Sequence, residues 1–181
     1  MSLGLVLVQG LNGLELGMLL FLIAAGLTLV FGVMDVVNLA HGVQYMLGAY
    51  LAVSFAAWTG SLWAALALAA AACLAIGTVL ERLLFRHLVG AGHLDQVLMT
   101  FGLILLAEEG VKWAWGPAPL SLSPPALLAG SVTLPDGLRY GTYRLAVLGA
   151  GLALAALLWL LIERTRGGMR LRAGASNAAM L

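Results

Sequence analysis

Polar side chains recur at a regular spacing within an otherwise apolar part of the chain. Four of them stand three residues apart: Asp35, Asn38, His41 and Gln44. On a helix this spacing gives a slowly drifting polar stripe. Polar groups at membrane depth usually face the interior of a helix bundle or a watery path. The stretch is therefore either part of a translocation path or a hydrated hairpin loop, and spacing alone does not separate the two.

The sequence shows no residue pattern that is typical of catalysis or of metal binding. No second histidine lies within helical reach of His41, whereas a metal site needs several convergent ligands. The nucleophile elbow, the His-Glu-x-x-His motif and the phosphate-binding Gly-x-x-x-x-Gly-Lys loop are absent. Glu109 and Lys112 are spaced to form an ion pair on one helix face. We expect no catalytic residue, no metal and no cofactor.

The composition indicates a protein that resides in a lipid bilayer. Of the 181 residues, 62% are apolar and 9% are charged, whereas a soluble domain has about 25% charged residues. Such a chain cannot coat a water-soluble particle, so a soluble enzyme is excluded. The net charge of +1 argues against nucleic-acid binding.

Long uncharged stretches predict membrane-spanning helices. Residues 36–80 contain no Asp, Glu, Lys or Arg, which suffices for two spans of about 20 residues around a turn at Thr59-Gly60-Ser61. Lipid cannot satisfy an open backbone, so the spans must be helical. We expect an all-α integral membrane protein, one transmembrane domain over 1–181, with an interrupted polar segment near 35–45. Five spans are predicted, over residues 13–34, 43–58, 61–80, 97–115 and 144–162.

Basic residues predict the orientation of these spans. The first 81 residues contain no Lys or Arg, whereas Arg82 and Arg86 follow the third span and four arginines follow the fifth. The positive-inside rule places both segments in the cytoplasm, so the N-terminus and the loop 116–143 lie outside. Trp and Tyr residues cluster at the predicted outer ends. All five prolines lie in that loop, which predicts extended chain with a short re-entrant piece near 126–128.

The most specific motif is Asn38-x-Ala40-His41-Gly42, followed by Tyr45-Met46-x-Gly48-Ala49-Tyr50. Residues 81–109, the Trp-Gly-Pro at 115–117 and the Arg-Thr-Arg-x-Gly-x-Arg-x-x-Ala at 164–173 add further matches. Together these segments resemble the branched-chain amino acid ABC transporter permeases of the LivH type. The resemblance runs in order from about residue 9 to residue 181 and covers nearly the whole chain.

The resemblance implies a permease subunit of a heteromeric importer in the bacterial inner membrane. Its partners would be a second permease subunit, cytoplasmic ATPase subunits, a periplasmic substrate-binding protein and the lipid bilayer. ATP hydrolysis would belong to the ATPases, and the substrates would be branched-chain amino acids, or urea and short amides as in close relatives. The implied translocation-path residues are Asn38, His41, Gly42, Gln44 and Tyr45. The implied ATPase-coupling residues, in a cytoplasmic segment 163–181, are Arg164, Arg166, Arg170, Arg172, Ala173 and Ala178.

Three departures from the family pattern leave an alternative function open. Family chains usually continue with further spans, residues 174–177 lack the usual acidic side chains, and Asp35 replaces a small or uncharged residue. The alternative is a truncated, nontransporting membrane bundle or interaction protein. On this basis we expect the 181 residues to insert into the membrane but not to support ATP-driven uptake with the ATPases and the binding protein alone. We also expect Gly167 and Gly168 to separate the last span from a short coupling helix.

Overall fold

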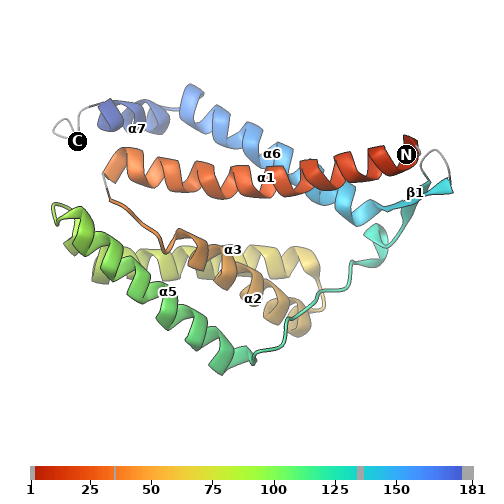
Figure 1. Cartoon of the computed structure of the whole chain (residues 1–181), viewed down its shortest axis with the longest axis horizontal. Coiled ribbons are helices and arrows are strands. Elements are labelled where there is room, and N and C mark those ends of the chain that lie inside the picture. Colours follow the sequence, from red (N-terminus) through yellow and green to blue (C-terminus); the bar gives the residue numbers. More distant parts are fainter. Residues whose placement is uncertain (1–2, 35, 134–136, 177–181) are drawn as a thin grey trace. The chain divides into compact units, whose positions relative to one another are not determined.

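The computed structural model describes residues 3–34, 36–133 and 137–176, and of these residues 33, 34, 170 and 174–176 by backbone alone. Most of the described chain is helical (Figure 1). The elements in chain order are α1 (Leu3–Met34), α2 (His41–Thr59), α3 (Leu62–Leu80), a π-helical turn (Glu81–Phe85), α4 (Arg86–Leu88), α5 (His93–Trp115), a 3₁₀ turn (Ala126–Leu128), β1 (Ser131–Thr133), β2 (Arg139–Gly141), α6 (Thr142–Arg164) and α7 (Arg166–Ser176).

Five long helices occupy the positions of the five predicted spans. Among the described residues, three stretches are long and apolar enough to cross a bilayer: Leu3–Gly32, Leu62–Leu88 and Thr142–Arg164. The other two helices, α2 and α5, are more polar, and α5 contains both Glu108 and Glu109. The all-α membrane class is confirmed, while the number of five spans stays a prediction.

α1 begins at Leu3, well before the predicted start at residue 13. Residues 3–12 contain neither proline nor a charged residue, and nothing in their sequence ends a helix there. The other predicted boundaries lie within a few residues of the observed ones, as for α6, predicted from 144 and observed from Thr142.

The chain divides into two compact units. One unit comprises Met1–Ala25 and Pro124–Leu181, and the other comprises Gly26–Ser123. α1 contributes its first part to one unit and its last part to the other, so each unit is described by itself. The single transmembrane domain expected from the sequence stays a prediction.

In the unit Gly26–Ser123, α2 and α3 form a tightly packed helical hairpin (Figure 1). The predicted turn is confirmed: Gly60 adopts a left-handed conformation with φ 66°, and its N–H donates to the carbonyl of Ala56 at 2.9 Å. Glycine allows the two helices to approach closely. At Gly48, for example, an added Cβ would lie only 3.4 Å from the Cys73 sulfur. Small residues at helix crossings are typical of membrane proteins.

In the other unit, the first part of α1 packs against α6. Gly151 is buried under the Met18 side chain, whose Cγ lies 2.5 Å from the position of a Cβ at Gly151. The Arg144 guanidinium donates to the Asn12 side-chain oxygen at 2.6 Å and lies 3.9 Å from the Glu15 carboxylate. These contacts fix the start of α6 on α1.

The proline-rich loop contains a short hairpin that the sequence analysis missed. β1 pairs with β2 in antiparallel register, with Val132 opposite Tyr140. The sequence between the strands reads Pro-Asp-Gly at 135–137, which is a turn signal flanked here by residues that favour strands. Residues 126–128 form a single 3₁₀ turn at the place of the predicted re-entrant piece.

The break between α6 and α7 lies at Thr165, so its predicted position at Gly167 and Gly168 is wrong. Thr165 has extended backbone angles, φ −105° and ψ 156°, and both glycines lie inside α7. The Thr165 hydroxyl accepts the Gly168 N–H at 3.0 Å, which is the geometry of a helix N-cap. The capping threonine therefore marks the corner, and both glycines follow it inside α7.

Candidate functional site

The polar segment between α1 and α2 is not one continuous helix, so Asn38, His41 and Gln44 do not form a single helical stripe. Among the described residues, 36–38 have no regular secondary structure, 39–40 form a turn, and α2 starts at His41. Asn38 therefore belongs to a helix interruption, and His41 and Gln44 belong to the first turns of α2. Asp35 lies outside the described residues. The predicted interruption near 35–45 is present, and side chains of α5 stabilise it by hydrogen bonds.

Two buried side chains of α5 satisfy the backbone of this interruption. The Val37 N–H donates to Gln96 Oε1 at 2.9 Å, and the Leu39 N–H donates to Thr100 Oγ1 at 3.4 Å. Gln96 and Thr100 are 2% and 1% exposed, and they lie one helical turn apart. Buried N–H groups outside regular structure need such partners. Gln96 and Thr100 thus replace the hydrogen bonds that a continuous helix would have made.

The Gln96 amide also closes the turn before α5. Its Nε2 donates to the carbonyls of Leu88 and Ala91, both at 3.2 Å. Beside it, Val36, Phe85 and Leu88 form a buried apolar cluster. The interruption is consequently held on its polar side by hydrogen bonds and on its apolar side by packing. Sequence reasoning missed Gln96 and Thr100, whose only signal is their i, i+4 spacing in an apolar helix.

A cavity of about 210 Å³ lies beside the interruption. Its lining residues are Val30, Val36, Asn38, Gln44, Gly77, Glu81 and Phe85. Asn38 is 5% exposed, and within the described part of the chain its Oδ1 has no hydrogen-bond partner. Glu81 and Phe85 come from the π-helical turn that follows α3, a helix irregularity that is frequent at functional sites.

His41 packs against the end of α1. Its ring is half-buried, and a Cβ at Gly26 would lie 2.6 Å from Nε2. Its Nδ1 is buried and has no hydrogen-bond partner among the described residues. The His41 ring therefore packs against Gly26, where the missing side chain leaves room for it. Unlike Asn38, His41 does not line the cavity.

Gly42 lines a separate groove of about 200 Å³ between α2 and α5. The groove is lined by Leu39, Gly42, Val43, Met46, Ile104 and Glu108. Tyr45 is 54% exposed, whereas Gln44 lines the cavity beside Asn38. The five predicted path residues are thus distributed: Asn38 and Gln44 share one cavity, Gly42 lines a groove, His41 packs on α1, and Tyr45 lies on the surface.

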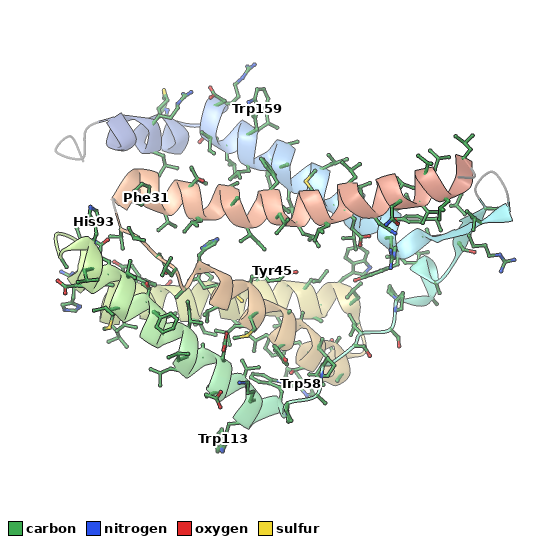
Figure 2. The ribbon with its side chains drawn as sticks, in the orientation of Figure 1. Phe31, Tyr45, Trp58, His93, Trp113 and Trp159 are labelled. Carbon is green, nitrogen blue, oxygen red and sulfur yellow. The ribbon has the colours of Figure 1, made fainter. Side chains whose placement is uncertain are left out.

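Aromatic residues gather near the C-terminal ends of α2 and α5. The Trp115 indole N–H donates to the Ser54 hydroxyl at 2.7 Å, and its ring lies 5.5 Å from that of Tyr50. Trp58 and Trp113 are 79% and 92% exposed, and Trp113 projects outward from the end of α5 (Figure 2). The predicted ion pair is present, with Lys112 Nζ 2.7 Å from Glu109 Oε1.

The predicted coupling residues lie on both sides of the α6–α7 corner. Arg164 ends α6, and Arg166, Arg170, Arg172 and Ala173 belong to α7. The Arg172 guanidinium donates to the Glu163 carboxylate at 2.5 Å, across the corner. The Arg170 side chain and Ala178 lie outside the described part of the structure.

Comparison with known proteins gives the same family across almost the entire chain. Residues 10–181 match the family model described as branched-chain amino acid transport system / permease component. The chain is 28% identical to the high-affinity branched-chain amino acid transport permease BraD of Pseudomonas aeruginosa, over 95% of this chain and 60% of BraD. It is 30% identical to the permease LivH of Escherichia coli K12, over 67% of this chain and 42% of LivH. No solved structure matches.

Proposed function

Because the chain belongs to the branched-chain amino acid transport permease family, we propose that it forms part of the translocation path of an ABC importer for branched-chain amino acids. The family and the apolar helices make it a multi-pass inner-membrane protein. The chain spans 60% of BraD and 42% of LivH, so its activity, substrates and partners are part of the proposal.

The helix interruption at 36–40 is the observation that carries this function. Irregular backbone at membrane depth is tolerated only where it is buried in protein or lines a cavity, and here it does both. Broken helices that line a polar cavity are a recurring feature of substrate sites in transporters. A hydrated hairpin loop, the other interpretation of this segment, would leave Asn38 exposed, whereas Asn38 is 5% exposed.

The family assignment supports the proposed partners, and charged and aromatic residues support the proposed orientation. A second permease subunit would complete the path, cytoplasmic ATPases would hydrolyse ATP, and a periplasmic binding protein would deliver substrate. The arginines at 164, 166, 170 and 172 support a cytoplasmic location for the α6–α7 corner, where the ATPases would bind. The exposed Trp58 and Trp113 support an opposite, headgroup-level location for the far ends of α2 and α5.

Uptake by proteoliposomes tests the proposal. The chain is reconstituted with the cognate second permease subunit, ATPases and binding protein, and uptake of labelled leucine is compared with uptake of urea and acetamide. We expect ATP-dependent accumulation of leucine. A Gly42→Leu variant fills the groove beside Glu108 and should lower the uptake rate at least about tenfold, since the groove would lose its space.

A Gly17→Leu variant is the matched control, because a Cβ at either glycine meets nothing within 4 Å, whereas Gly42 lines the groove and Gly17 does not. Its uptake should equal that of the unmodified chain. Absence of uptake by an assembly that inserts and binds its partners would favour the nontransporting bundle. Accumulation of urea or acetamide without leucine would instead assign a different substrate.

A further inference from the structure

The cavity beside Asn38 combines an apolar lining with hydrogen-bonding groups of both kinds. Val30, Val36 and Phe85 contribute apolar surface. Asn38 and Glu81 contribute oxygen acceptors, and Gln44 contributes an amide that also donates. Such a combination fits a small ligand that carries a cation, an anion and a hydrocarbon group, because pockets bind by apolar burial and fix orientation with few polar groups.

The Asn38 side-chain oxygen lacks a hydrogen-bond donor among the described residues. A buried acceptor without a partner costs about 1–3 kcal/mol, and Asn38 Oδ1 is such an atom among the described residues. The Glu81 carboxylate lines the same cavity and is acceptor-only when ionised. A ligand with several N–H donors on one positively charged group satisfies both oxygens, and an ammonium group has this chemistry.

A second hollow continues from the same residues. Gln44, Gly77 and Glu81 also line an open hollow of about 570 Å³ between α2 and α3. A Cβ at Gly77 would lie 3.4 Å from Gln44 Nε2, so a larger residue at 77 would crowd the amide. The hollow and the cavity therefore adjoin at Gln44, Gly77 and Glu81, which offers the ligand a route past Gln44.

We propose that this cavity is a binding site for an α-amino acid with a branched aliphatic side chain. Its ammonium group lies toward Asn38 and Glu81, its carboxylate accepts from the Gln44 amide, and its side chain packs among Val30, Val36 and Phe85. The cavity volume of 210 Å³ exceeds the volume that several water molecules occupy in the liquid, about 30 Å³ each. The inference deepens the proposed function and rests on it, since it locates the substrate inside this one chain.

Thiol protection measures binding in the cavity without relying on transport. Val30→Cys is introduced into a Cys73→Ser chain, which removes the only native thiol, and the full assembly is treated with a small methanethiosulfonate reagent. Leucine should slow the modification of residue 30. Asn38→Leu and Gln44→Leu each remove a hydrogen bond to a charged group of the ligand, and Glu81→Gln removes the negative charge that faces the ammonium. Each variant should raise the half-protecting leucine concentration at least about tenfold.

Ligand analogues separate the parts of the site. Isopentylamine lacks the carboxylate and 4-methylpentanoate lacks the ammonium, so both should protect at least about tenfold less well than leucine. Gln9→Leu, at an exposed position of α1, is the matched control and should leave protection unchanged.

Uptake and protection together distinguish failure of this site from failure of the proposed function. Leucine uptake without protection of residue 30, or with protection that the three variants do not weaken, overturns the site and leaves the function standing. Equal protection by urea and leucine overturns the assignment of the ligand. Absence of both uptake and protection overturns the function and the site together.

Discussion

Gln96 shows how one buried side chain permits a break in a membrane helix. An amide has one oxygen acceptor and two N–H donors, and here all of them bind backbone groups. The oxygen accepts from Val37, and the nitrogen donates to Leu88 and Ala91. The Val37 N–H and the Ala91 carbonyl lie outside helices, and the Leu88 carbonyl ends α4 and also accepts from the Ala91 N–H at 3.1 Å. Lipid and apolar side chains offer no hydrogen bond to such groups.

Replacing Gln96 with Leu should destabilise the unit Gly26–Ser123. The variant keeps a similar volume but removes the partner of the Val37 N–H and of the Ala91 carbonyl and one of the two hydrogen bonds of the Leu88 carbonyl, at a cost of about 2 kcal/mol or more. The apparent melting temperature of the detergent-solubilised chain should fall by several degrees. Gln9→Leu should leave it unchanged. A melting temperature equal to that of the unmodified chain would show that water replaces the amide.

Gly26 and His41 should behave as a coupled pair. Gly26→Ala places a Cβ 2.6 Å from His41 Nε2, so the ring must move and stability should fall by about 1–3 kcal/mol. Adding His41→Ala should remove most of this loss, because the obstacle is gone. The control is Gly32→Ala, also in α1, where a Cβ meets nothing within 4 Å. Additive effects of Gly26→Ala and His41→Ala in the melting temperature would contradict the contact.

At the scale of elements, the corner between α6 and α7 is fixed by three neighbouring contacts. Thr165 caps α7 through the Gly168 N–H and donates its own hydroxyl to the Leu161 carbonyl at 2.5 Å. Glu163 and Arg172 pair across the corner at 2.5 Å. A Cβ at Gly168 would overlap the backbone carbonyl oxygens of Leu161 and Ile162. α7 therefore leaves α6 in a defined direction.

Gly168→Ala should disrupt this corner, and Gly167→Ala should not. The alanine at 168 meets backbone that has no rotamer with which to move away, whereas a Cβ at Gly167 lies 3.6 Å from the Thr165 hydroxyl, an ordinary contact. Spin labels at Leu154 and Leu171 should report a broadened distance distribution for Gly168→Ala alone. Equal distributions for both alanine variants would show that the corner does not depend on Gly168.

Local signals in the sequence predict the helices and the turn at Gly60, but not the contacts that make the site. Apolar stretches and glycine act on their immediate neighbours, so α2, α3 and α6 are found close to their predicted positions. Gln96 acts on Val37 across 59 residues, and only the packing of α5 beside the interruption shows this. Thr165 was missed because two following glycines give a stronger local signal for a break. The hairpin β1–β2 was missed because five prolines in 116–143 suggested irregular chain throughout.

At the scale of the whole molecule, the distribution of charge and aromatic residues determines how the chain is expected to lie in the membrane. Basic residues follow α3 and α6, and exposed tryptophans lie at the ends of α2 and α5. Positive charge near a span is retained on the cytoplasmic side during insertion, and indole rings favour the headgroup region. Both distributions predict one orientation, with the 116–143 loop periplasmic.

Sided labelling should confirm this orientation. In a Cys73→Ser chain, Ser123→Cys lies in the proline-rich loop and Met169→Cys lies on an exposed position of α7. A membrane-impermeant maleimide should label residue 123 in right-side-out vesicles and residue 169 only in inverted ones. Detergent treatment should make both thiols reactive, which controls for burial. Between them lies α6, an apolar helix of 23 residues that is long enough to cross a bilayer once. Labelling of both positions from one side would therefore mean that α6 does not span, and the orientation assigned from the arginines would be wrong.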